Sequence, residues 1–274
     1  MADAFDMFRY TARLGTKEIG HTLLTRESTA STNDDAWSMY TGMARGGAAV
    51  LAREQTRGRG RAGRRWEQVP GKGLALSVAL RLDFDVRRAG AIPLAAGLAV
   101  ARAAHALGVP AARLKWPNDV LVGGKKLAGV LCEMRRVPSG RDGAMSHAVA
   151  IGIGMNVRQA REEFPPELRD LATSLALEGS DASLEDAAAA CLTDLEPLWN
   201  ELQAGDHAAV LAAWSALAPH WGRSLRVRTP AGEVEGIALR LDADGGLVLR
   251  TNDGTETTVF AGDLEPAAGR WDEA

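Results

Sequence analysis

The chain has 274 residues, of which 46% are hydrophobic and 24% charged, and its formal net charge is -3. A chain of this size can bury a substantial core, and its ordinary composition excludes a disordered chain or one that binds nucleic acid over its whole surface. Cys132 and Cys191 form no disulfide framework or metal-binding spacing, and no apolar run is long enough for a signal peptide or a membrane span. We therefore expect a cytoplasmic protein that acts on neither a membrane nor a nucleic acid.

Hydrophobic patterning predicts a succession of strands and helices over residues 1–221. Short apolar runs bounded by turn residues predict strands at 21–24, 48–52, 74–80, 125–133 and 148–157. Helical spacing, together with N-cap residues and glycine or proline stop signals, predicts helices at 33–45, 92–107, 184–202 and 207–221. Residues 1–20 are weakly patterned and predict at most a short helix. The expected fold class is α+β, with a mixed sheet flanked by helices.

The pattern changes after Trp221. Short strands alternate with turn sequences rich in glycine, asparagine and aspartate, and we expect strands at 224–229, 233–241, 247–251 and 256–260. Strands of this length and spacing are typical of a small SH3-like β-barrel. The sequence therefore predicts two domains, residues 1–221 and residues 222–274.

A basic loop at residues 57–66 is unlike the rest of the chain. It carries five arginines, three glycines and no acidic residue. Its spacing matches the dinucleotide-binding fingerprint Gly58-x-Gly60-x-x-Gly63, but the apolar helix that this motif opens is missing after Trp66. A solvated loop, a phosphate clamp for nucleic acid, and a loop that folds over a small anionic ligand all stay open. We expect the loop to be ordered when an anion is bound.

Two other motifs each allow a structural and a functional interpretation. Ser31, Thr32 and Asn33 stand at the start of a predicted helix, where their side chains either cap the helix or face a ligand. Gly152 and Gly154 stand two apart in a predicted buried strand, so both lie on one face. Either another strand packs closely there, or a ligand ring lies on the two glycines.

Pro117 interrupts the apolar stretch 113–122, which we interpret as a central strand. Proline cannot donate a hydrogen bond to a sheet, and it holds the preceding residue extended. Lys115, Asn118 and Asp119 stand at this interruption. The segment is either a plain turn or a site that gathers a lysine, an amide and an acid.

The glycine pair at 123–124 predicts a tight hairpin turn between this stretch and the next strand. In the returning strand, simple alternation puts Lys126 and Ala128 on one face and Lys125 and Leu127 on the other. One of the two lysines should therefore point towards the site.

These residues are compatible with only a few classes of reaction. The sequence has no metal-binding set of histidines and cysteines, no Ser-His-Asp order and no paired catalytic carboxylates. Many cations without a covalent nucleophile suit a reaction at a phosphoryl centre, where positioning and charge neutralisation supply most of the catalysis.

In order and approximate spacing, these segments resemble the biotin protein ligases. The resemblance rests on five segments: Ser31-Thr32-Asn33, Gln55 with residues 58–66, Lys115 to Asp119, Lys126 to Gly129, and Gly152-x-Gly154-x-Asn156. The family is similar in catalytic fold to the lipoate ligases and octanoyl transferases, which are the alternative. One departure is Ala62, at a position where members often carry another basic residue.

The resemblance implies a two-step reaction with ATP, Mg²⁺ and biotin. Biotin is first activated to biotinoyl-5'-AMP, and the biotinoyl group then passes to a lysine of a biotin carboxyl carrier domain of a biotin-dependent carboxylase. About 30 residues precede Ser31, too few for the winged-helix DNA-binding domain of bifunctional members. We therefore expect a ligase that does not repress transcription and that is a monomer or homodimer.

The resemblance also implies roles for individual residues, while the metal ligands stay unassigned. The expected catalytic residues are Lys126, Arg61 and Asp119. The expected biotin-binding residues are Ser31, Thr32, Asn33, Gln55, Gly58, Arg59, Arg61, Lys126, Gly129, Gly152 and Gly154. The expected nucleotide-binding residues are Arg59, Arg61, Arg64, Trp66, Lys115, Asn118, Lys126 and Asn156.

Overall fold

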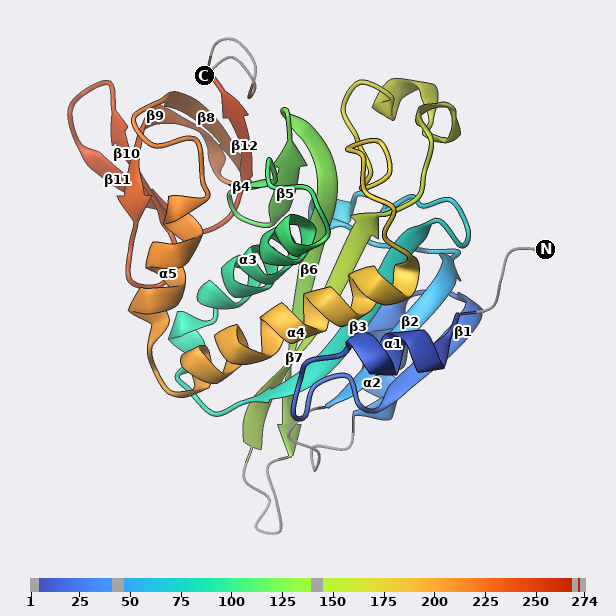
Figure 1. The fold of residues 1–274 in the computed structure, drawn as a ribbon. Coiled ribbons are helices and arrows are strands. Elements are labelled where there is room, and N and C mark those ends of the chain that lie inside the picture. The colour runs from blue at the N-terminus through green and yellow to red at the C-terminus, as the bar shows by residue number, and fades with distance from the viewer. Residues whose placement is uncertain (1–4, 41–46, 139–144, 268–270, 272–274) are drawn as a thin grey trace.

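The computed structural model describes residues 5–40, 47–138, 145–267 and 271, and it contains two β-sheets with helices packed against them (Figure 1). The larger sheet is seven-stranded, in the order β1-β2-β3-β7-β6-β5-β4. Only β1 and β2 are parallel in this sheet, so it is mixed, as predicted. Its strands are β1 (Leu23–Thr29), β2 (Ala48–Gln55), β3 (Gly73–Leu82), β4 (Arg113–Lys115), β5 (Asp119–Val122), β6 (Lys125–Pro138) and β7 (Met145–Asn156).

The helices agree with the predicted pattern except at some of their ends. They are α1 (Met7–Arg13), α2 (Thr32–Met39), α3 (Ala91–Ala106), α4 (Leu184–Gln203) and α5 (His207–Ala216). Helix α2 was predicted to reach residue 45, but Tyr40 is extended and its ring packs edge-on against Trp37. Residues 41–46 of that prediction lie outside the described residues. Helix α5 stops five residues early, because Pro219 disfavours the helical conformation just before it.

The two faces of the large sheet differ in side-chain size. On β3, Leu76 and Leu80 belong to the main core, which α3, α4 and α5 cover. The alternate residues Ser77 and Ala79 face the other side, where α2 packs. Strand β7 repeats this alternation, with large apolar residues towards the core and alanine or glycine opposite. The small side chains leave room on the α2 face for a site.

Two predictions about the region around Pro117 are wrong. Strands β4 and β5 pair antiparallel, so Pro117 lies in a hairpin turn at the edge of the sheet and not within a central strand. Lys126 and Ala128 were also predicted to share one face of their strand. Lys126 pairs with Leu121 and Ala128 pairs with Val120, so Leu127 is an extra residue that forms a bulge in β6. A bulge breaks the simple alternation of faces. Ala128 therefore enters the core, whereas Lys126 does not.

The C-terminal strands form an antiparallel five-stranded sheet in the order β11-β10-β9-β8-β12. They are β8 (Ser224–Thr229), β9 (Gly232–Leu241), β10 (Leu247–Thr251), β11 (Glu256–Val259) and β12 (Asp263–Pro266), of which the last was not predicted. Trp116 Nε1 donates to Gly245 O at 3.1 Å, which ties this sheet to the β4–β5 turn. A domain boundary at residue 221 stays a prediction. No helix in the described ranges is long and apolar enough to cross a membrane.

Candidate active site

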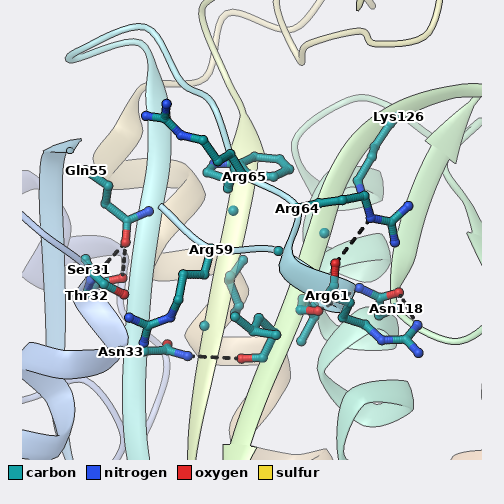
Figure 2. A pocket seen from close by; sticks show the side chains of 18 residues that line it. Ser31, Thr32, Asn33, Gln55, Arg59, Arg61, Arg64, Arg65, Asn118 and Lys126 are labelled. Carbon is teal, nitrogen blue, oxygen red and sulfur yellow. Dashed lines mark hydrogen bonds between the residues drawn. The ribbon is translucent and has the colours of Figure 1, made fainter. Parts of the chain in front are cut away.

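A polar cavity of about 130 Å³ lies on the α2 face of the large sheet, beneath the basic loop (Figure 2). It is bounded by the start of α2, the end of β2, the loop at 58–66, and strands β6 and β7. Most of the predicted site residues meet here. The lining residues are Ser31, Thr32, Asn33, Gln55, Arg59, Gly60, Arg61, Arg64, Arg65, Trp66, Asn118, Lys126, Gly129, Val130, Leu131, Gly152, Ile153 and Gly154.

The start of α2 supplies one end of the cavity. Ser31 occupies the N-cap position, yet its side chain makes no capping hydrogen bond. The N–H and hydroxyl of Thr32 donate to Gln55 Oε1 at 2.8 and 3.1 Å. Because that oxygen is occupied, the Gln55 Nε2 amide remains as a donor at this end of the cavity. Hydroxyls and one oriented amide suit a small ligand that offers both hydrogen-bond donors and acceptors.

The basic loop folds back on itself as a narrow hairpin. Gly60 N–H donates to Arg64 O at 2.7 Å, and Trp66 N–H donates to Gly58 O at 3.0 Å. A side chain at Gly58 would overlap the Trp66 carbonyl, so glycine is required at this close approach. At the tip of the hairpin is the short 3-10 helix η1 (Arg61–Gly63).

Arg59 and Arg64 of the loop are paired with carboxylates of the protein. The Arg59 guanidinium makes a bidentate contact with Asp34 at 2.7 and 2.8 Å and a further bond to Glu133 at 3.1 Å. Arg64 pairs with Asp263 of the C-terminal sheet at 2.6 Å. The Asp34 carboxylate raises the pKa of Arg59 above its ordinary value. These pairs hold the loop closed over the sheet.

Arg61 is the most deeply placed cation of the loop. Its Nη1 donates to Asn118 Oδ1 at 3.0 Å and to Gly262 O at 3.4 Å, and Figure 2 shows it pointing towards Asn118. Burial lowers the pKa of Arg61 from its ordinary value, partly opposed by Asp263 and Asp119. Arg61 has neutral hydrogen-bond partners where Arg59 has carboxylates, so it is the better placed of the two to accept an anion.

Lys126 lies at the opposite end of the cavity from Thr32. Its Nζ is 2.6 Å from Asp119 Oδ1 and 5.9 Å from the centroid of the Trp66 ring. The Lys126 side chain lies over Gly129, where a methyl group would stand 3.1 Å from Nζ. The bulge and this glycine together direct the ammonium group into the cavity. The predicted inward-pointing lysine is therefore Lys126.

Lys115 stands apart from the other predicted residues. Its ammonium group is 5.4 Å from the centroid of the Trp271 ring, and the residue lines neither this cavity nor the one next to it. Burial lowers the pKa of Lys115 below its ordinary value. Among the described residues, Lys115 belongs to the junction with the C-terminal sheet and not to the cavity wall.

Gly152 and Gly154 of β7 accommodate side chains from across the cavity. A methyl group at Gly152 would overlap the Asn33 amide, and one at Gly154 would overlap the Trp66 ring. Side-chain packing thus accounts for both glycines. Trp66 is thereby seated directly on the sheet between Gly154 and Lys126.

Gly154 lies against the Trp66 ring, so a larger residue there tests the position of Trp66. We expect Gly154→Ala to displace Trp66, to lower the free energy of unfolding by about 1–3 kcal/mol, as is usual for overpacking, and to weaken the ATP binding that the resemblance implies for Trp66. Isothermal titration of ATP together with a melting curve would separate lost binding from lost folding. Unchanged ATP affinity in the folded variant would contradict the assigned position of Trp66.

A second cavity of about 650 Å³ begins at Trp66 and Lys126 and extends past Asp119 and Asn156. Its far wall comes from the segment 163–172, which sequence reasoning did not assign to the site, and combines apolar residues with the carboxylates of Glu163 and Glu167. The newly found lining residues include Gln159, Phe164, Leu168, Leu171 and Ala172. No motif marks this segment in the sequence. Only its position directly after β7 could have suggested that it lies near the site.

The Asn156 amide is itself engaged in the protein. It donates to Thr173 O at 2.9 Å, and its oxygen accepts a hydrogen bond from Gln159 at 3.1 Å. These contacts fasten the chain that follows β7 to the wall of the second cavity. Within the described ranges, no cluster of three or more histidine, cysteine or acidic residues could hold a metal ion.

The fold agrees with comparisons with known proteins. Residues 26–156 match the biotin/lipoate A/B protein ligase family, and residues 220–264 match the biotin protein ligase C terminal domain. The chain is 38% identical over 246 residues to the biotin--[acetyl-CoA-carboxylase] ligase of Mycobacterium tuberculosis, covering 86% of this chain and 85% of that one. It is 33% identical over 254 residues to the bifunctional ligase/repressor BirA of Bacillus spizizenii, covering 92% and 76%.

A solved structure gives the same result. The biotin protein ligase of Aquifex aeolicus in complex with biotin and ATP superposes with a TM-score of 0.73 at 26% identity, covering 90% of this chain and all of that one. The chain belongs to the biotin protein ligase family.

Proposed function

We propose that this protein joins biotin to AMP and then transfers the biotinoyl group to a lysine of a biotin carboxyl carrier domain. One observation carries the proposal: a small polar cavity and a larger, partly apolar cavity meet at Lys126 and Trp66. A ligand whose head lies at Thr32 and whose carboxylate reaches Lys126 would present that carboxylate at the mouth of the second cavity. A nucleotide in the second cavity would bring its α-phosphate to the same lysine.

In the first step, a biotin carboxylate oxygen bonds to the α-phosphorus of ATP, and the bond from that phosphorus to the bridging oxygen of pyrophosphate breaks. Negative charge builds up on the phosphoryl oxygens in the transition state. Lys126, held by Asp119 at 2.6 Å, is the preorganised cation for this charge. Trp66 provides the adjoining wall for the nucleotide.

In the second step, the acceptor lysine amine attacks the acyl carbon, the acyl–phosphate bond breaks, and AMP leaves with the electron pair of that bond. The amine loses one proton, for which Asp119 is the nearby carboxylate. A mixed anhydride must be kept from water until the acceptor arrives. The closed loop performs this task, with Arg59 fastening it to the α2 side and Arg61 facing the intermediate.

We propose that Mg²⁺ enters as the MgATP substrate. Magnesium is commonly held by substrate phosphates and one or two carboxylates, without a dedicated protein cage. Of the carboxylates that line the second cavity, Asp119 is the one next to Lys126 and therefore fits this role. The wall residues Arg64 and Asn156 lie along the same cavity.

We further propose a cytoplasmic enzyme, a monomer or homodimer, with a C-terminal unit that begins at residue 222. The two cysteines are free, which suits a reducing compartment. The carrier domain must reach the cavity from the loop side, where the adenylate would be enclosed.

The test is transfer to a purified carrier domain. With biotin and MgATP, mass spectrometry should find one lysine modified, and parallel reactions with lipoate or octanoate should give none. Modification by lipoate or octanoate but not by biotin would assign the protein to the related acyl transferases. No transfer of any acid would reject the proposal.

A further inference from the structure

The Ser77 hydroxyl lies behind the cavity wall and links two residues of that wall. Ser77 is in β3, is fully buried and does not itself line the cavity. Its Oγ is 2.7 Å from Thr32 Oγ1 and 2.7 Å from Asn33 Oδ1. A polar side chain in an otherwise apolar buried strand would destabilise the fold without such partners.

The chemistry of the Asn33 amide fixes the direction of its hydrogen bond with Ser77. The Asn33 amide nitrogen donates to Glu133 Oε2 at 3.0 Å, so its oxygen faces Ser77 and can only accept. Ser77 must therefore give its single proton to Asn33. The Thr32 hydroxyl has one proton and two oxygen neighbours, Ser77 Oγ at 2.7 Å and Gln55 Oε1 at 3.1 Å, and with that proton given to either of them the Thr32 oxygen keeps a lone pair for a ligand. The Ser77 hydroxyl thus links Thr32, an acceptor towards the cavity, to Asn33.

The same chain of hydrogen bonds continues to the basic loop. Glu133 accepts from Asn33 and also from Arg59 at 3.1 Å, and Arg59 is bidentate to Asp34. One connected series therefore runs from Thr32 at the ligand end of the cavity to Arg59 at the base of the loop. Figure 2 shows the Arg59 and Asn33 side chains meeting at one end of this cavity.

We propose that Ser77 is a positioning residue that couples ligand recognition at Thr32 to closure of the basic loop through Asn33, Glu133 and Arg59. The identity of the ligand as biotin rests on the proposed function, whereas the link from Ser77 to the loop does not. Any such coupling is reciprocal: a loop held closed favours the ordered Thr32 acceptor, and a ligand at Thr32 favours the closed loop.

The first arm of the experiment measures the loop in the protein alone. Trypsin cleavage at the arginines of the loop reports loop opening. Ser77→Ala should increase the cleavage rate by about three- to tenfold, which is the usual weight of one buried hydrogen bond. Ser77→Thr keeps the hydroxyl and should restore the rate, with melting curves showing that both variants are folded. Cleavage of Ser77→Ala at the wild-type rate would overturn the proposal.

A double-mutant comparison distinguishes coupling along this series of hydrogen bonds from a local loss of structure around Ser77. Ser77→Ala and Glu133→Gln should be non-additive, because each interrupts the same series of hydrogen bonds. Asp263→Asn is the matched control, since it removes a loop ion pair that is outside this series. Its effect should add to that of Ser77→Ala. Full additivity of Ser77→Ala with Glu133→Gln would contradict the coupling.

The second arm uses biotin and ATP as separate probes. Ser77→Ala should weaken biotin binding by about tenfold and ATP binding in the absence of biotin by clearly less, because the hydroxyl acts at the Thr32 end and reaches the nucleotide cavity only through the loop. Equal losses for both ligands would argue for general loosening and against the proposed role. Failure of the wild-type protein to bind biotin would reject the proposed function, while the cleavage arm would still decide the coupling.

Discussion

Replacing Lys126 with alanine is expected to slow biotin-dependent exchange of pyrophosphate into ATP by about 100- to 1000-fold. Removing one preorganised group from a developing negative charge typically costs about 3 kcal/mol of transition-state stabilisation. Lys126 is the cation that Asp119 holds where the two cavities meet, whereas Arg59 and Arg64 are paired with other carboxylates and Arg61 donates to Asn118. The loss should appear mainly in the maximal exchange rate.

Lys125 supplies the matched control. It precedes Lys126 on β6, carries the same charge and lines neither cavity. Lys125→Ala should retain exchange within a factor of about two, as expected for a substitution away from the site. Equal rates for the two alanine variants would show that the site does not depend on Lys126.

Replacing Arg61 with glycine is expected to release the adenylate faster by about 10- to 100-fold. The Arg61 guanidinium joins the loop to Asn118 and Gly262 at 3.0 and 3.4 Å, and hydrogen bonds of a charged group contribute about 1.5–3 kcal/mol. A released mixed anhydride would acylate amines at random. Labelling of lysines on an added bystander protein should therefore rise together with the rate of adenylate dissociation.

Arg57→Gly is the control for this prediction. Arg57 is an exposed arginine of the same loop and lines neither cavity, so its replacement changes charge and flexibility without opening the Arg61 contacts. Bystander labelling should stay at the wild-type level. If Arg61→Gly keeps the wild-type dissociation rate, the loop does not retain the intermediate.

The pattern of apolar residues and the turn residues were sufficient to predict the main strands and the turn that position the site. The apolar runs at 74–80 and 148–157 and the glycine turn at 123–124 placed β3, β7 and the β5–β6 turn correctly. The bulge at Leu127 was not predictable, because an extra residue in a strand leaves the pattern of apolar residues almost unchanged. Pro219 is a residue that ends helices, so the sequence could have predicted that α5 ends before it.

The partners of the basic loop could not be predicted from its own sequence. Asp34, Glu133 and Asp263 lie 25, 74 and 199 residues from the arginines that they bind. No rule of local spacing connects such positions. For the same reason Ser77 looked like an ordinary polar residue in a buried strand, although its hydroxyl joins Thr32 to Asn33.

The central claim is that the two cavities bring a biotin carboxylate and the α-phosphate of ATP together at Lys126. The most direct measurement is exchange of labelled pyrophosphate into ATP by the purified protein, without carrier domain, in the presence of biotin, lipoate, octanoate or no acid. Exchange that requires biotin and Mg²⁺ is the predicted result. Exchange that is absent with biotin, or equally fast without any acid, would contradict it.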